Sequence, residues 1–214
     1  MAENTFPHVS HVCRVFQLLP DRGVVGVTAI DKRPVDGKVK VGALGLYADV
    51  QADRAHHGGE EQAVYAFATE DVRVWEKELG LEIAPGAFGE NLRTEGIDTS
   101  NAVIGTRWKI GSAELEVTIP RVPCSTFARR MGIDDWVQQF TENGNTGAYL
   151  RVVRKGSLQA GDSIDVTHVP AHGVTVRQLF EGPTVAQAQA LLEAQRKGEM
   201  DLTPKVVREI NRVL

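Results

Sequence analysis

Short runs of alternating apolar and polar residues dominate the chain up to Pro170 and predict a protein built mainly of β-strands. Asp36-Gly37 is a strong signal for a two-residue turn, so we expect a hairpin over residues 35–41, whereas residues 31–34 have the composition of a polar turn. This density of short strands and glycine-containing turns favours a barrel over a doubly wound sheet. The predicted strands are residues 12–18, 23–30, 63–67, 103–111, 114–119, 148–153 and 163–169.

Helical periodicity occurs in three parts of the chain. Residues 69–79 place Val72, Trp75 and Leu79 on one face and end at Gly80. A short helix over residues 127–131, with Ser125 or Thr126 as its cap, precedes a second apolar face made by Ile133, Trp136, Val137 and Phe140. After Pro170, helices are predicted at residues 175–180 and from the caps Thr184 and Thr203. We therefore expect a β domain over residues 1–170 and a small helical appendage over residues 171–214.

Composition and charge narrow the class of protein. The chain has 214 residues, 42% of them hydrophobic, which is enough for one sizeable core, and its formal net charge of −4 gives no general attraction to nucleic acid. No apolar run reaches the length of a membrane span, and residues 1–5 do not begin a secretion signal. We therefore expect a cytoplasmic protein with no nucleic acid or membrane partner. The two cysteines are too few for a disulfide framework.

Cys124 is the candidate reactive residue. The strand at residues 114–119 leads into Pro120-Arg121-Val122-Pro123-Cys124, so the thiol lies between the end of a strand and the start of a helix. Arg121, Arg129 and Arg130 add positive charge nearby, which favours the thiolate form that attacks electrophiles and binds soft metals. The alternative is that Cys124 is a small buried hydrophobic residue, as lone cysteines commonly are.

Two glycine-containing loops carry further polar candidates. His56-His57-Gly58-Gly59 places two histidines beside glycines that allow the backbone to approach a ligand closely, although an exposed polar turn explains the same pattern. Residues 86–92 carry Glu90 and Asn91 together. Asn91 can either bind a ligand or brace its own turn.

These loops, taken in their order along the chain, resemble the MOSC domain, which is named after the C-terminal domain of molybdenum cofactor sulfurase. The resemblance covers roughly residues 10–170. The tail is similar to the helical extension of the stand-alone YiiM-like subgroup. The resemblance implies a barrel similar to the β-barrel domain of pyruvate kinase, with peripheral helices. The matching blocks are residues 35–39, 51–53, 56–59, 63–65, 86–92, 120–124 and 156–162.

The resemblance also implies a pocket for the molybdenum cofactor, molybdopterin. Cys124 matches the family cysteine that binds molybdenum or carries its sulfur, and a soft thiolate suits that metal. His57 and Asn91 match positions expected to line the pocket, with His56 and Glu90 beside them. Arg121 and Lys32 are candidates for holding the cofactor phosphate. One departure is Ala48-Asp49-Val50, where family members often have Gly-Asp followed by a polar residue.

The leading hypothesis is a molybdenum-dependent reductase of N-hydroxylated bases or related N-oxygenated small molecules. His57 would deliver a proton to the departing oxygen, or would only hydrogen-bond its own loop. The sequence has no recognisable flavin, haem, iron–sulfur or dinucleotide motif, so the electrons would come from an external donor protein.

Two alternatives belong to other classes of protein. One is a module that carries or sulfurates the cofactor without turning over a substrate; because 214 residues leave no room for the sulfurase's pyridoxal-phosphate domain, sulfuration would need a partner. The other is a zinc hydrolase using His56 or His57, Cys124 and Glu90, which lacks close ligand spacing. The tail would dock the donor, form a homodimer or cover a sheet edge.

Overall fold

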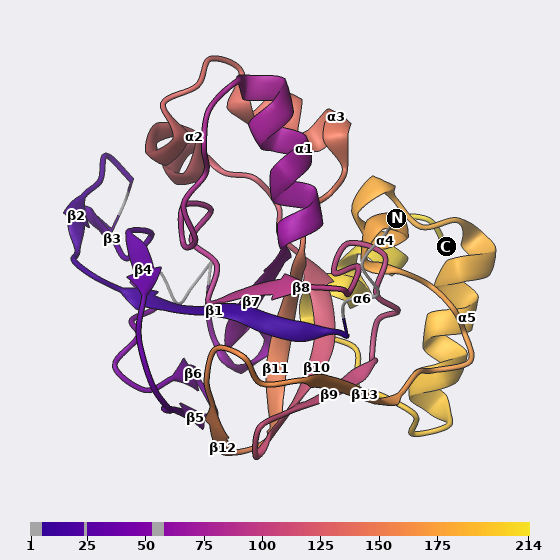
Figure 1. Ribbon diagram of the computed structural model, residues 1–214. Coiled ribbons are helices and arrows are strands. Elements are labelled where there is room, and N and C mark those ends of the chain that lie inside the picture. Colours follow the sequence, from indigo (N-terminus) through magenta and orange to yellow (C-terminus); the bar gives the residue numbers. More distant parts are fainter. Residues whose placement is uncertain (1–5, 24, 53–57) are drawn as a thin grey trace, which may run out of the picture.

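The computed structural model describes residues 6–23, 25–52 and 58–214, and an eight-stranded sheet forms its centre (Figure 1). All neighbouring strands in it are antiparallel except β7 and β8, which are parallel and are joined through a helix on the sheet. The mainly β prediction is confirmed. The sheet order is β13 (Ile164–His168), β9 (Arg107–Ile110), β10 (Ala113–Pro120), β11 (Ala148–Arg154), β7 (Val64–Ala68), β8 (Leu92–Glu95), β1 (His8–Val15) and β4 (Lys32–Pro34).

Two small sheets lie beside the main one. One contains β12 (Gly156–Leu158), β5 (Val39–Gly42) and β6 (Gly45–Leu46), and the other contains β2 (Leu19–Pro20) and β3 (Val27–Thr28). The predicted hairpin around Asp36-Gly37 is wrong. This turn joins β4, which pairs with β1, to β5, which pairs with β6 and β12, because longer-range pairing outweighs the local turn signal. The polar turn predicted at residues 31–34 is also wrong, because residues 32–34 form the strand β4.

The expected barrel is not fully closed. Within the described ranges, the strand ladder runs from β13 to β4 without returning to its start. The segment that leads into β13 nevertheless contacts β1, the strand next to β4, since His8 and Ser163 form an isolated bridge and the amide of Val9 donates to the carbonyl oxygen of Asp162 at 3.0 Å. This contact stays an isolated bridge, and residues 13–15 of β1 pair with β4 instead, so the sheet is strongly curved but does not close into a barrel.

The helices form two groups (Figure 1). Helices α1 (Thr69–Leu79), α2 (Ser125–Met131) and α3 (Trp136–Asn143) gather at one end of the sheet, and α4 (Val176–Glu181), α5 (Val185–Arg196) and α6 (Pro204–Ile210) lie along its side. A single 3₁₀ turn, η1 (Glu60–Gln62), precedes β7. Over the part of the chain that the structure describes, no helix is long and apolar enough to cross a membrane.

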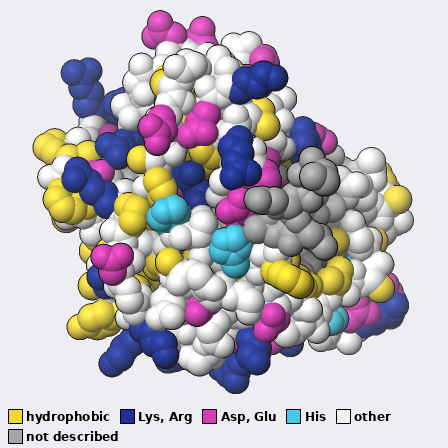
Figure 2. All heavy atoms as spheres, in the orientation of Figure 1, with side chains coloured by type: hydrophobic (Ala, Val, Ile, Leu, Met, Phe, Trp, Pro, Cys, Tyr) yellow, Lys and Arg dark blue, Asp and Glu magenta, His cyan; other side chains and the backbone are white. Residues whose placement is uncertain are grey.

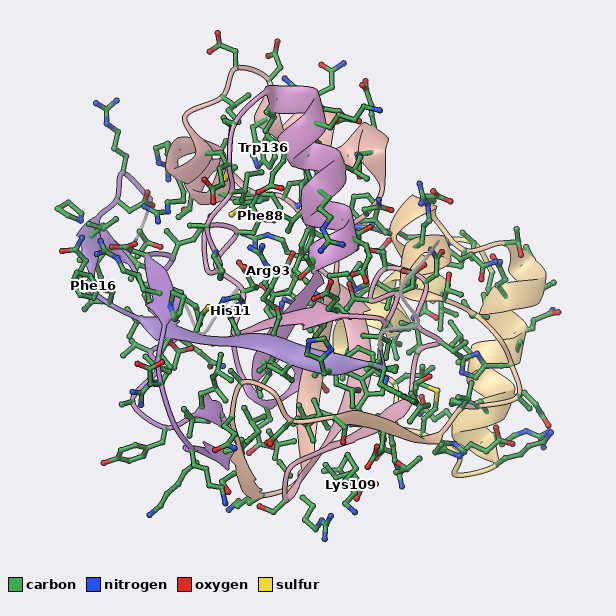
Figure 3. All side chains as sticks on the ribbon, in the orientation of Figure 1. His11, Phe16, Phe88, Arg93, Lys109 and Trp136 are labelled. Atoms are coloured by element: carbon green, nitrogen blue, oxygen red, sulfur yellow. The ribbon has the colours of Figure 1, made fainter. Side chains whose placement is uncertain are left out.

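Two clusters of buried side chains hold these layers together. The larger one combines residues from the strands with residues from α4, α5 and α6, so the tail packs into the same core as the sheet. The smaller one is aromatic and lies between α1, α2 and α3, where Trp136 lies above Phe88 in Figure 3. The predicted boundary at residue 170 stays a prediction, but the cores on its two sides are continuous.

Candidate functional site

A pocket of about 340 Å³ opens beside the start of α2, where loops from both halves of the sheet meet. This volume lies within the usual range for small-molecule sites. Of the predicted site residues in the described part of the chain, Cys124, Arg121, Asn91 and Lys32 line it, whereas Glu90 does not. Its other polar lining residues include Asp21, Asp49, Gln51, Gln62, Tyr65, Thr126 and Tyr149.

Cys124 occupies the cap position of α2, in extended backbone with φ −134° and ψ 169°. The expected cap at Ser125 or Thr126 is wrong by one or two positions, because the helix begins directly after the cysteine. The Cys124 thiol is half-buried and faces the pocket. Cys13, in contrast, is fully buried, and burial together with the nearby Glu90 carboxylate raises its pKa to about 12. The two thiols therefore differ: Cys124 is accessible from the pocket, whereas Cys13 is buried and expected to be unreactive.

Arg121 is a buried cation in the pocket wall, with an exposed fraction of 6%. Its Nη1 donates to the carbonyl oxygen of Phe88, and its guanidinium carbon lies 3.7 Å from the ring centre of Phe127 and 5.1 Å from that of Tyr65. Among the residues that the structure describes, no carboxylate forms an ion pair with it. A buried charge of this kind is costly unless an anion neutralises it.

Tyr65 and Tyr149 form an aromatic wall beside this cation, with ring centres 5.0 Å apart. Burial raises the pKa of both phenols, so they stay neutral. Burial alone would lower the pKa of Arg121, but the two tyrosines and Cys124 outweigh it and raise that pKa. The pocket therefore presents a fixed positive charge between neutral rings and the thiol.

A buried polar network occupies another part of the pocket wall. Asp49 accepts hydrogen bonds from the Val15 amide at 2.7 Å and from Asn91 Nδ2 at 2.8 Å, and it forms an ion pair with Lys32. Asn91 also donates to the Cys13 carbonyl oxygen and accepts from the Tyr65 amide at 3.1 Å. Asn91 therefore braces two strands and a loop rather than its own turn. The charge of Lys32 is largely offset by Asp49, which leaves Arg121 as the stronger anion-binding group.

Glu90 lies behind the pocket and holds a loop that contacts Arg121. Its carboxylate accepts from the amides of Gly86 at 2.7 Å and Phe88 at 3.0 Å, and it pairs with the buried Arg93. Gly86 has φ +88°, and a Cβ atom there would lie 2.3 Å from the Lys32 carbonyl oxygen, so only glycine fits. Glu90 can thus influence the pocket through Phe88, whose carbonyl oxygen accepts from Arg121.

His56 and His57 lie outside the described residues, so their roles stay predictions. Sequence reasoning gave no role to Asp49, Gln62 or Tyr149, all of which line the pocket. The sequence offered one signal for Asp49, the departure from the family pattern at Ala48-Asp49-Val50. Gln62 and Tyr149 carry no such signal, because only the packing of η1 and β11 brings them to the pocket.

The pocket mouth is largely apolar. Val25, Val27, Val50 and Val122 line the pocket and are 46%, 41%, 43% and 63% exposed. Beside them, Arg129 forms an ion pair with Asp21 at the edge of the pocket. Figure 2 shows hydrophobic and basic side chains intermixed on the side of the molecule formed by β2, β3 and β4.

Among the described side chains, no group of three or more histidine, cysteine, aspartate and glutamate residues is arranged to hold a bare metal ion. A zinc site of the usual three or four protein ligands is therefore not seen in this part of the chain. Cys124 is the one thiol that lines the pocket among the described residues.

Comparison with known proteins adds independent findings. The model of the MOSC domain family matches residues 53–165. Uncharacterized protein YflK of Bacillus subtilis is 32% identical over 150 residues, which cover 70% of this chain and 68% of that protein. Protein YiiM of Escherichia coli is 34% identical over 65% of this chain and 63% of that protein. A Gibberella moniliformis protein named Reductase is 32% identical over 70% of this chain but only 28% of its own length.

The fold is also similar to solved structures. The crystal structure of YiiM from Geobacillus stearothermophilus matches with a TM-score of 0.77, covering 97% of this chain and 99% of that one. The sequence identity in this match is 23%, so the likeness concerns the fold. It includes the tail helices, which lie within the matched length.

Proposed function

Because this chain belongs to the MOSC domain family, among its YiiM-like members, we propose that it binds the molybdenum cofactor in the Cys124 pocket and reduces N-hydroxylated compounds. The observation that carries this proposal is that one pocket holds both a half-buried thiol and a buried guanidinium, and that no carboxylate among the described residues forms an ion pair with that guanidinium. The name of the fungal relative, Reductase, supports the same class of reaction.

The residues present fit the cofactor. A thiolate is a soft ligand suited to molybdenum, and Arg121 is a planar cation suited to a phosphate. The cavity of about 340 Å³ is of small-molecule size, and the Tyr65 and Tyr149 rings offer apolar surface to a flat heterocycle. When bound, the cofactor supplies two-electron redox chemistry at a metal.

Residues of the protein would bind the metal and the anionic group and would exclude water. Cys124 would hold the metal, Arg121 would hold the anionic group, and Lys32 with Asp49 would keep another part of the wall polar and fixed. The exposed valines at the mouth would pack against an apolar substrate and keep bulk water from the reacting atoms.

The reaction needs electrons and protons from outside the pocket. Converting R–NHOH to R–NH₂ and water breaks the N–O bond and consumes two electrons and two protons. We propose that a donor protein supplies the electrons and that solvent supplies the protons through an acidic side chain. His57 is the sequence-based candidate for that acid.

The test is elemental analysis and pterin fluorescence on protein purified from cells that make the cofactor, comparing the natural chain with Cys124→Ser. Near-stoichiometric molybdenum and pterin are expected in the natural chain, and loss of molybdenum in the variant. Cys13→Ser is the matched control and should retain both, since Cys13 lies outside the pocket.

A turnover assay then distinguishes a reductase from a protein that only carries the cofactor. Reduction of an N-hydroxylated base by the loaded protein with dithionite as artificial electron source supports the reductase. Bound molybdenum and pterin without any reduction would instead favour a carrier or sulfuration module. Absence of both from the natural chain would overturn the proposal and leave only the shared fold.

A further inference from the structure

Gln62 is a buried pocket residue at the end of η1, with an exposed fraction of 7%. It directly precedes Ala63, which also lines the pocket, and the strand β7 that carries Tyr65. The position of this single turn therefore sets part of the pocket wall.

The side chains of Gln51, which lines the pocket, and of Thr118, in β10, form hydrogen bonds with the backbone of this turn. The Gln51 Oε1 atom accepts from the Gly59 amide at 2.8 Å, and Gln51 Nε2 donates to the carbonyl oxygens of Gly59 and Gln62 at 3.4 and 3.3 Å. From β10, Thr118 Oγ1 donates to the carbonyl oxygen of Glu61 at 2.6 Å. The side-chain oxygen of Gln62 is bound from a different part of the chain.

That partner is Lys205, whose Nζ donates to Gln62 Oε1 across a sequence separation of 143 residues. Lys205 lies in the first turn of α6, which Thr203 caps by accepting from the Val206 amide at 3.2 Å. Val206 and Ile210 belong to the main core cluster and are 1% and 0% exposed. The backbone of Lys205 is therefore fixed relative to the sheet, and its side chain reaches the pocket wall.

We propose that Lys205 is a positioning residue through which the C-terminal helix fixes Gln62 and the η1 turn in the wall of the cofactor pocket. The proposal rests on the proposed function only in naming the pocket's ligand. Without Lys205, the side-chain oxygen Oε1 of Gln62 loses its donor. The Gln62 side chain then rotates toward the cavity or toward water, and the η1 turn becomes less rigid. The C-terminal tail therefore stabilises the pocket wall as well as the core.

The first experiment uses the full chain without cofactor and measures amide hydrogen exchange. Lys205→Met should speed exchange of the Gln62 amide, which donates to the Gly59 carbonyl oxygen, by about tenfold or more, because local opening becomes easier. Lys205→Arg should restore protection. Arg208→Met is the matched control, an exposed cation on the same helix, and should leave exchange unchanged.

The second experiment measures pterin and molybdenum retained after dialysis of the same variants. Lys205→Met should lower retention by about fivefold or more, while the midpoint of thermal unfolding stays within about 3 °C of the natural chain. In a Gln62→Leu background, Lys205→Met should cause a clearly smaller further loss, because the hydrogen bond between the two side chains is already absent.

The outcomes separate the two proposals. Unchanged exchange at Gln62 in Lys205→Met overturns the positioning role, whatever the protein binds. Faster exchange with unchanged retention overturns the coupling to the site. Faster exchange in a protein that binds no pterin even in its natural form leaves the positioning of the turn standing and overturns the proposed function.

Discussion

Arg121 combines a full positive charge with surroundings that are mostly aromatic. The rings of Phe127 and Tyr65 contribute cation–π attraction, which is worth about 2 kcal/mol or more for a desolvated group. Desolvation of the guanidinium opposes this by a similar or larger amount. Arg121 therefore adds little to the free energy of folding, whereas its buried charge favours the binding of an anion.

Arg121→Met should separate these two contributions. We expect the free energy of unfolding of the cofactor-free protein to change by less than about 1 kcal/mol, because the lost ring contacts and the relieved desolvation offset each other. Pterin retention should fall more than about tenfold, since a charged hydrogen bond to phosphate is lost. Arg121→Lys should recover little, because lysine lacks the planar fork. Chemical denaturation and dialysis measure the two effects, and a large stability loss with intact retention would contradict this account.

The two thiols should differ in reactivity. Iodoacetamide at pH 8 should alkylate Cys124 in the native cofactor-free protein and spare Cys13, whose burial raises its pKa to about 12 and blocks access. Peptide mass mapping gives the answer, with denatured protein as the control in which both react. Native labelling of Cys13 at a comparable rate would show that its part of the core opens readily.

Asp71 should make stability depend on pH. Burial raises its pKa to about 6, although Ser100 donates a hydrogen bond at 3.1 Å that favours the charged form. A raised carboxyl pKa means that the folded protein prefers the protonated form, so a penalty appears as pH rises from about 4 to about 6 and persists above that. Asp71→Asn should therefore add about 2–3 kcal/mol at pH 8 and less than about 1 kcal/mol at pH 4. Urea unfolding at both pH values tests this, and an equal effect at both would exclude titration as the cause.

At the scale of elements, the site is built at boundaries between strands, loops and helices. β10 ends at Pro120, and the next four residues bring Arg121 and Cys124 to the pocket before α2 begins at Ser125. The backbone of β10 is held by β9 and β11 on its two sides, so this connection starts from a rigid strand. A short loop between fixed ends places a thiol more accurately than a long one.

The cap of α6 should matter to stability. Thr203 is 1% exposed and its hydroxyl accepts from the Val206 amide, so Thr203→Ala should lower the free energy of unfolding by about 1 kcal/mol. Thr203→Ser retains the hydroxyl and should lose far less. Thermal or urea unfolding distinguishes them. Equal losses in the two variants would assign the effect to the missing methyl group instead of the cap.

At the scale of the whole molecule, the tail and the sheet share one core. Leu191 and Ile210 are fully buried in the same cluster as Val117 and Leu150 of the central strands. Elements that share a core of this kind are expected to unfold together.

Residues 1–170 alone should therefore fail to fold cooperatively, because removing the tail exposes the apolar surface that it covers. Ile210→Ala in the full chain should lower the stability of the single transition by about 2–4 kcal/mol without splitting it. Circular dichroism during heating tests both. Cooperative unfolding of the 1–170 fragment would establish the tail as a separate domain.

Much of the secondary structure was predictable where local signals agree with the fold. The helix at residues 69–79 is confirmed to the residue, because its acidic first turn, apolar face and terminal Gly80 all act within the helix. Strands β8 and β12 were not predicted. β8 has four residues and β12 has three, too few to show an alternating pattern, and both form by pairing with strands far away in the chain.

The sequence by itself determined the mainly β class, the helical tail and the candidates Cys124 and Arg121, since composition, periodicity and ordered loop motifs are local properties. Only the tertiary structure decided which candidates meet. It placed Cys124, Arg121, Lys32 and Asn91 in one pocket, set Glu90 behind it and brought Lys205 to Gln62. The physical reason is that burial, ion pairing and side-chain hydrogen bonds depend on contacts between distant segments, which are fixed only when the core is packed.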